Sequence, residues 1–215
     1  VPTIVVLVNG RPLTVEWIAR HVPAVIEAWE PGLYGGQAVG EILYGKVSPS
    51  AKLPVTIPRS VGQIGCYYNH KYCAYRFPYA TGKTEPLYEF GFGLSYTTFK
   101  YSNPRLSAST ISTTDSVRVS VDITNTGAID AEEVAQLYIR DDYSSATRPM
   151  KELKGFERIF LKAGETKTVS FLVTPESLAY YDAQMKYGVE PGTFTMMVGS
   201  SSRDKDLQRL HLTVK

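Results

Sequence analysis

Apolar and polar residues alternate with a period of two in Val117-Arg118-Val119-Ser120-Val121-Asp122-Ile123. This is the pattern of a β-strand with one face in a core and the other toward solvent. Six or more short strands at near-regular spacing predict a β-sandwich over residues 99–215, of the immunoglobulin-like or fibronectin type III-like kind. The other strand-like runs, separated by turns rich in Gly, Pro and Asp, are 134–139, 153–161, 166–173, 193–198 and 207–214.

Residues 1–58 have a different pattern, typical of an α/β fold. The β-branched run 3–8 predicts a strand buried on both faces of a parallel sheet. Pro23 prevents one continuous helix after it, so we expect a short helix near 13–20 and a second strand over 24–29. A helix is predicted over 36–44. Two parallel strands do not make a stable sheet, so this piece is expected to need further strands from outside the chain.

Residues 59–98 form a long connection with few periodic signals, as in a functional loop or a linker lying over neighbouring domains. Seven of the 15 tyrosines fall between residues 66 and 96. Tyrosine suits both sugar surfaces and protein interfaces, and packing against neighbouring domains is the favoured interpretation. Cys66 and Cys73 lie seven positions apart, and both a disulfide and two unlinked thiols remain open.

Composition excludes several classes of protein. The formal net charge is +2 over 215 residues, and the basic residues form no run, which argues against nucleic-acid binding. The longest apolar run, Ile4–Val8, is far too short to span a bilayer. The chain opens at Val1 without a targeting leader and runs straight into a strand, so we expect a piece of a longer protein.

Seven short motifs stand in order along the chain. They are Asn9-Gly10-Arg11-Pro12, Trp29-Glu30-Pro31-Gly32, Gly35-Gly36, Lys52-Leu53-Pro54, Phe90-Gly91-Phe92-Gly93-Leu94-Ser95-Tyr96, Glu133-Val134-Ala135-Gln136-Leu137-Tyr138 and Leu153-Lys154-Gly155-Phe156. As a set, the first five resemble the carboxyl-terminal part of glycoside hydrolase family 3, the β-glucosidases and β-xylosidases. The last two resemble the fibronectin type III-like domain that closes many members.

The resemblance implies a retaining β-glycosidase that releases terminal β-linked glucose or xylose. Such a reaction uses two carboxyl groups about 5–5.5 Å apart, a nucleophile and an acid/base. In the family, the nucleophilic Asp lies in an amino-terminal barrel and the acid/base Glu earlier in the α/β domain. No catalytic residue is therefore assigned to this chain, which is expected to be inactive alone, with the missing barrel and the rest of the α/β domain as its partners.

Two residues near the predicted strand ends are candidate substrate-binding residues. Glu30 follows the second strand, and sites in α/β folds gather at the carboxyl ends of parallel strands. A turn role is favoured for Glu30 over a catalytic one. Arg11 follows the first strand and is suited to a sugar hydroxyl or to an acidic neighbour, with the structural role favoured.

Tyr68 and His70 are the other two candidates. They lie in Cys66-Tyr67-Tyr68-Asn69-His70-Lys71, which combines aromatic platforms with hydrogen-bonding side chains, as a sugar subsite requires. The hypothesis is that this loop borders the aglycone side of the assembled pocket or a homodimer contact. The three histidines lack metal-ligand spacing, and neither a metal nor a cofactor is expected.

A second function class stays open beside the enzyme. A carbohydrate-binding or interaction module would carry a row of exposed aromatics on one strand face of the sandwich. The tyrosines of residues 138–187 are scattered over turns and alternate strands, which disfavours that hypothesis. A secreted or periplasmic location fits a polysaccharide-degrading enzyme.

Overall fold

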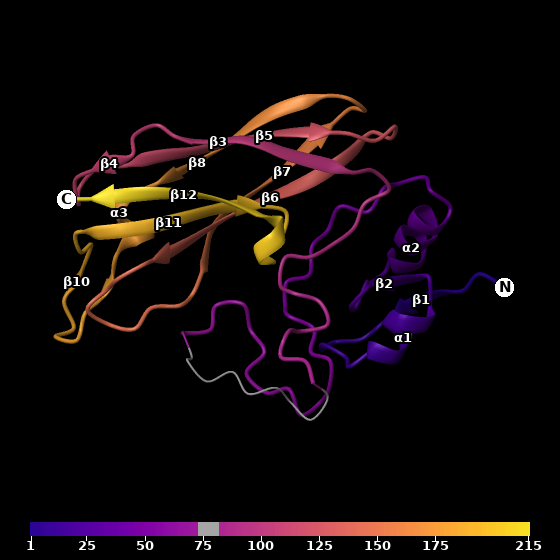
Figure 1. Cartoon of the computed structure of the whole chain (residues 1–215). Helices are drawn as coiled ribbons and strands as arrows, with labels where there is room; N and C mark the ends of the chain where they lie inside the picture. Colours follow the sequence, from indigo (N-terminus) through magenta and orange to yellow (C-terminus); the bar gives the residue numbers. More distant parts are fainter. Residues whose placement is uncertain (73–81) are drawn as a thin grey trace.

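The computed structural model describes residues 1–72 and 82–215, so Cys73 lies outside the described residues. Figure 1 shows a β-sandwich at one end, which holds the C-terminus, and a small α/β piece at the other, which holds the N-terminus. Long irregular segments run between them. This is the predicted fold class, an α/β fragment followed by an all-β sandwich.

The α/β piece contains two parallel strands, β1 (Ile4–Leu7) and β2 (Ala24–Glu27), paired in the register Ile4 to Ala24. The strands and the helix α2 (Gly35–Leu43) were predicted, and all three are confirmed. The predicted burial of the first strand on both faces was wrong for this chain, because β1 pairs only with β2 among the described strands, which leaves Ile4 49% exposed. The helix α1 (Glu16–His21) begins three residues later than expected. It ends at His21, because the next residue, Val22, precedes Pro23 and is pushed out of the helical region into an extended conformation.

The sandwich has a five-stranded and a three-stranded sheet. The larger sheet has the order β4-β12-β11-β6-β7 and the smaller has the order β3-β5-β8. All pairs are antiparallel except β12 with β4. The bounds are β3 Phe99–Leu106, β4 Thr110–Ile111, β5 Val117–Asn125, β6 Ala131–Asp141, β7 Glu152–Leu161, β8 Thr166–Val173, β11 Gly192–Gly199 and β12 Leu207–Val214.

The core lies between these two sheets. Val117, Val119, Val121 and Ile123 of β5 are each at most 1% exposed, and they pack in one cluster with apolar side chains of β6, β8, β11 and β12. The alternation along β5 therefore marks its buried face, as predicted. The strands predicted at 134–139, 153–161, 166–173, 193–198 and 207–214 are also confirmed.

Several short elements were not individually predicted. The edge strand β3 has a register shift between Ser102 and Arg105, where Asn103 has φ 51° and Pro104 follows. Proline is tolerated there because an edge strand need not donate every backbone hydrogen bond. The remaining short elements are α3 Pro175–Leu178, β9 Tyr180–Tyr181, β10 Tyr187–Gly188 and the 3₁₀ turn Asp204–Asp206.

The described part of the connection contains no helix or strand, as expected. Two isolated bridges hold it. Tyr88 of the connection pairs with Ile57 just before it, and Lys71 pairs with Pro149 of the sandwich. The boundaries at residues 58 and 98 stay predictions. No helix in the described residues is both long and apolar enough to cross a bilayer.

Candidate functional site

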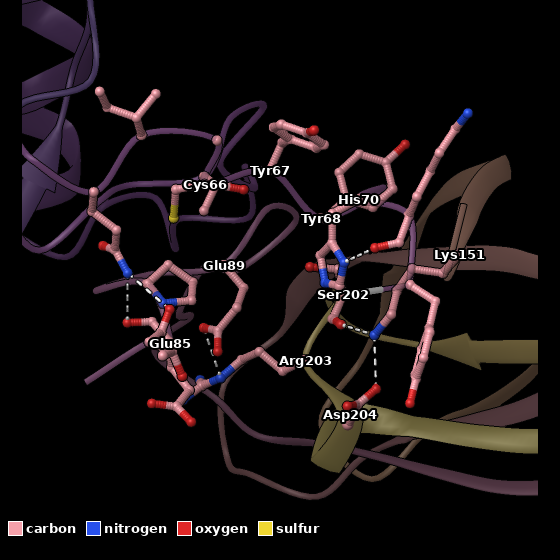
Figure 2. Close-up of a pocket in the computed structure, with 18 residues that line it drawn as sticks. Cys66, Tyr67, Tyr68, His70, Glu85, Glu89, Lys151, Ser202, Arg203 and Asp204 are labelled. Atoms are coloured by element: carbon pink, nitrogen blue, oxygen red, sulfur yellow. Dashed lines mark hydrogen bonds and ion pairs between the residues drawn. The ribbon is translucent and has the colours of Figure 1, made fainter. Parts of the chain in front are cut away.

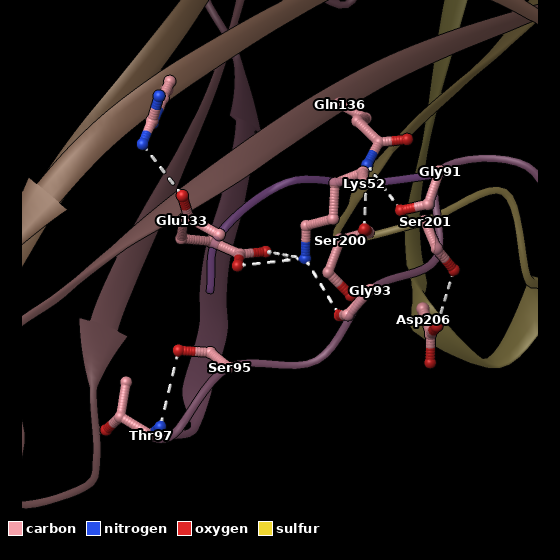
Figure 3. Close-up of polar contacts among 12 residues, drawn as sticks. Lys52, Gly91, Gly93, Ser95, Thr97, Glu133, Gln136, Ser200, Ser201 and Asp206 are labelled. Atoms are coloured by element: carbon pink, nitrogen blue, oxygen red, sulfur yellow. Dashed lines mark hydrogen bonds and ion pairs between the residues drawn. The ribbon is translucent and has the colours of Figure 1, made fainter. Parts of the chain in front are cut away.

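A buried ion pair fastens the last part of residues 1–58 to the sandwich (Figure 3). The Nζ of Lys52 donates to both carboxylate oxygens of Glu133 on β6, each at 3.1 Å, and to the Gly93 carbonyl at 3.4 Å. The Tyr101 hydroxyl donates to the same carboxylate at 2.9 Å. Burial raises the pKa of Glu133, and the Lys52 charge opposes this rise. Lys52 therefore joins its own motif and the motif around Gly93 to the strand β6.

A second set of contacts holds the Phe90–Gly91 segment. Gln136 on β6 donates to the Gly91 carbonyl at 3.1 Å and to the Ser200 carbonyl at 2.8 Å. Ser202 donates to the Phe90 carbonyl through its hydroxyl at 2.8 Å and its backbone N–H at 3.1 Å. Gly91 has φ 77°, and a Cβ there would collide with the Gln136 side chain, so both conformation and space require glycine.

A pocket of about 590 Å³ opens beside this anchored segment (Figure 2). Its volume falls within the roughly 300–1,000 Å³ of typical small-molecule sites. One wall comes from the connection and the other from the sandwich. The lining includes Gln63, Cys66, Tyr67, Tyr68, His70, Lys71, Tyr72, Glu85 and Glu89 from the connection, and Lys151, Ser202, Arg203 and Asp204 from the sandwich.

Two ion pairs line the pocket. Lys151 lies 2.7 Å from Asp204 and also donates to the Ser202 carbonyl at 2.8 Å. Arg203 lies 3.3 Å from Glu89, and its guanidinium is 4.5 Å from the Phe92 ring centroid. These charged groups are therefore held in fixed positions by protein partners.

The two adjacent tyrosines of the wall have different environments. Tyr68 stacks on Phe90 with a centroid distance of 4.2 Å and meets Tyr138 edge-on at 5.7 Å. Its hydroxyl accepts a hydrogen bond from Leu153 N at 3.4 Å. Tyr67 is 55% exposed, and it follows the turn at Gly65, which has φ 75°. Tyr68 is therefore an anchor in the wall, whereas Tyr67 offers an accessible ring.

His70 and Cys66 complete the predicted loop. The His70 carbonyl accepts from Met150 N at 2.9 Å, and its ring Nδ1 lies 3.0 Å from the Lys71 carbonyl. These contacts join the loop to the sandwich just before β7. Burial, with a smaller contribution from Glu89, raises the pKa of the Cys66 thiol, so Cys66 is disfavoured as a thiolate nucleophile.

Arg11 and Glu30 do not line this pocket. They follow β1 and β2 at the carboxyl edge of the small sheet, where Asn9 N donates to the Trp29 carbonyl at 3.1 Å. Glu30 lies close to the backbone of Gly10, since a Cβ on that glycine would be 2.7 Å from Glu30 Oε1. The structure thus divides the four predicted residues between two places.

The sandwich wall is the part of the site that sequence reasoning missed. Lys151 and Asp204 are 53 positions apart and reach the pocket only through the strand order. The one sequence signal is the polar run Ser200-Ser201-Ser202-Arg203-Asp204 directly after an apolar strand. Within residues 1–72 and 82–215, no cluster of His, Cys, Asp or Glu is arranged to hold a metal ion.

Comparison with known families identifies both parts of the chain. Residues 1–96 match the glycosyl hydrolase family 3 C-terminal domain, and residues 133–202 match the fibronectin type III-like domain. The chain belongs to glycoside hydrolase family 3. The predicted resemblance is confirmed.

Relatives in this family align with nearly all of the chain. A β-xylosidase of Formosa agariphila is 48% identical over 100% of the chain and 30% of its own length. A periplasmic β-glucosidase of Salmonella typhimurium is 44% identical over 94% of the chain and 28% of its own length. The chain thus spans under a third of the length of these glycoside hydrolase family 3 relatives.

Solved structures give the same result. A β-glucosidase from Erythrobacter marinus superposes with a TM-score of 0.94 at 44% identity, covering 99% of this chain and 28% of that one. The β-glucosidase from Listeria innocua in complex with glucose superposes with a TM-score of 0.93 at 37% identity, covering 99% and 31%. Both parts of this family 3 chain therefore have the backbone arrangement found in these enzymes.

Proposed function

We propose that this chain is the C-terminal portion of a retaining β-glycosidase that hydrolyses terminal β-linked glucose or xylose from oligosaccharides and glycosides. The observation that carries the proposal is the match of nearly the whole chain to proteins named β-glucosidase and β-xylosidase, at 44–48% identity. The name of the Salmonella relative supports a secreted or periplasmic location.

The chain is proposed to be inactive alone. Retaining hydrolysis needs two carboxyl groups flanking one bond. Of the three acidic residues that line the described pocket, Glu85, Glu89 and Asp204, the last two are held by Arg203, Lys151 and Arg209. Carboxylates whose oxygens already contact Arg and Lys side chains are poorly placed to flank a glycosidic bond as a catalytic pair. Both catalytic carboxylates are accordingly assigned to the amino-terminal part of the parent enzyme.

The four candidate residues keep substrate-binding roles in this proposal. His70 and Tyr68 belong to the pocket, Tyr68 as the anchor of the loop that carries Tyr67. Arg11 and Glu30 belong to the carboxyl edge of the small sheet, which is proposed to face the rest of the α/β domain and the barrel. A homodimer contact of the loop stays a prediction.

Activity assays test this proposal. The 23.8 kDa chain and the longer parent protein are each incubated with an aryl β-glucoside and an aryl β-xyloside. The expected result is turnover of at least one substrate by the parent and none by the chain. Turnover by the chain alone would place a catalytic pair within these residues, and Glu30→Gln would then be the first variant to assay.

The alternative, a carbohydrate-binding or interaction module without a catalytic parent, has a different signature. The parent would then turn over neither substrate while the chain still bound polysaccharide. Among the described residues, the exposed tyrosines Tyr143, Tyr181 and Tyr187 lie in turns and short end elements. Phe156 and Phe160 are exposed on the strand β7, and two rings on one strand give this alternative only a weak signature.

A further inference from the structure

We infer that the pocket between the connection and the sandwich is a binding site for a neutral oligosaccharide chain, and that the fibronectin type III-like domain supplies one of its walls. The inference deepens the proposed function, on which it rests only for the class of ligand. It gives the sandwich a direct part in recognising carbohydrate, through Lys151 and Asp204.

The charge of the lining favours a neutral ligand. The lining includes three cationic residues, Lys71, Lys151 and Arg203, and three acidic ones, Glu85, Glu89 and Asp204. An anionic ligand would meet as much repulsion as attraction in such a lining. Hydroxyl groups both donate and accept, so a polyhydroxylated ligand is suited to alternating carboxylate and ammonium partners.

The polar side chains are positioned before a ligand arrives. Lys151 has a side chain only 13% exposed, held between Asp204 and the Ser202 carbonyl. The Asp204 side chain is 75% exposed and accepts at one oxygen from both Lys151 and Arg209, at 2.7 and 3.0 Å. Preorganised partners reduce the entropy lost when a ligand binds.

An accessible aromatic ring lies on the opposite wall. Tyr67 is 55% exposed and comes from the Gly65 turn, while its neighbour Tyr68 is packed on Phe90. The flat apolar face of a tyrosine can stack on the C–H face of a sugar ring, and its hydroxyl can hydrogen-bond with the sugar's hydroxyl groups. Tyr67 and the charged groups line the same pocket, which therefore offers both a stacking platform and hydrogen-bonding partners, as a sugar site requires.

Direct binding tests the inference without any need for catalysis. Xylotetraose and cellotetraose are titrated into the chain and followed by calorimetry, with Tyr67→Ala, Lys151→Met and Asp204→Asn as pocket variants. Tyr143→Ala is the matched control, since Tyr143 is 86% exposed and does not line the pocket. We expect saturable binding of at least one sugar. Its affinity should fall about tenfold or more in each pocket variant, a loss of about 1.4 kcal/mol in binding free energy, and should be unchanged in the control.

Three results would overturn the inference. They are absence of saturable binding, equal affinity of pocket and control variants, and a pocket variant that changes the oligomeric state in sedimentation while sugar binding is kept. Thermal unfolding of each variant separates misfolding from lost contacts, and Asp204→Asn, the isosteric change of an exposed group, keeps the test valid if Lys151→Met unfolds. Aryl glycoside turnover by the parent reports independently on the proposed function.

Discussion

The Lys52 ammonium lies 3.1 Å from the Glu133 carboxylate, with the two side chains only 11% and 3% exposed. The pair joins residues 81 positions apart, one just before the connection and the other on β6, which lies between β11 and β7 in the larger sheet. A buried pair of this kind is weak evidence for net stability, but each partner depends strongly on the other. The link between the two parts of the chain is therefore sensitive to single substitutions.

Replacing Lys52 alone should be strongly destabilising. Lys52→Met leaves the Glu133 carboxylate buried beside the Tyr101 hydroxyl without its cation. We expect the free energy of unfolding at pH 7 to fall by about 3–5 kcal/mol, measured by urea denaturation. The double variant Lys52→Met with Glu133→Gln should lose clearly less, and a double variant as unstable as the sum of the single ones would contradict this account.

The same variant should acquire a pH dependence. Burial already raises the pKa of Glu133, and loss of Lys52 removes the main group that opposes the rise. A folded-state pKa above the unfolded one means that stability is present at low pH and is lost as pH rises through the folded value. Urea midpoints of Lys52→Met measured from pH 4 to pH 8 should therefore decrease, and a flat profile would exclude Glu133 as the cause.

Gly91→Ala should destabilise the anchored segment. The backbone there has φ 77°, and the new Cβ would meet the Gln136 amide and the Tyr138 hydroxyl. We expect a loss of about 2 kcal/mol or more in the free energy of unfolding. Gly40→Ala is the control, because it lies inside α2 with nothing within 4 Å, and it should gain about 0.5–1 kcal/mol. Effects of the same sign would contradict the assignment.

Tyr67→Ala and Tyr68→Ala should separate binding from stability. Tyr68 packs on Phe90 and Tyr138, so its truncation leaves a gap in that cluster and should cost about 2–4 kcal/mol by thermal unfolding. Tyr67 is exposed, and its truncation should change stability by less than about 0.5 kcal/mol. A comparable loss of stability in Tyr67→Ala would show that its ring packs in the wall and is no platform.

Asp141 should lower stability above pH 6. Burial raises the pKa of this carboxyl to about 6, and its Oδ2 has no hydrogen-bond partner among the described residues. Since the unfolded value is near 3.9, stability is fully present below about pH 4 and is lost as pH rises through about 6. With partial solvent exposure, we expect the loss to be about 1–2 kcal/mol. Asp141→Asn should abolish this loss in urea denaturation at pH 4 and pH 7.5, and a loss retained in the variant would point to another group.

The sandwich was largely predictable because its strands are regular. β5 lies between β3 and β8 and buries one face, so its sequence alternates without interruption. β3 gave no such signal, since Pro104 and the left-handed Asn103 break its alternation. β3 tolerates those residues because it is an edge strand. Its edge position depends on how the sheet assembles and cannot be recognised from a short stretch of sequence.

The candidate site was predictable only on one side. Tyr68 and His70 stood out because aromatic and hydrogen-bonding residues are concentrated in one short loop. Lys151 and Asp204 did not, because each belongs to an ordinary turn until the sheets assemble and bring them together. The different exposure of Tyr67 and Tyr68 also depends on tertiary packing, since the two residues are identical and adjacent.

The hydrogen bonds from Gln136 and Ser202 to the Gly91 and Phe90 carbonyls also limit how such domains are exchanged between enzymes. A chimaera that takes only residues 99–215 from a relative would combine a foreign β6 with the resident Lys52 and Gly91. The unit that recombines intact is thus larger than the sandwich. It also includes the segments near Lys52 and Gly91, which must be transferred together with β6 because they are hydrogen-bonded to that strand.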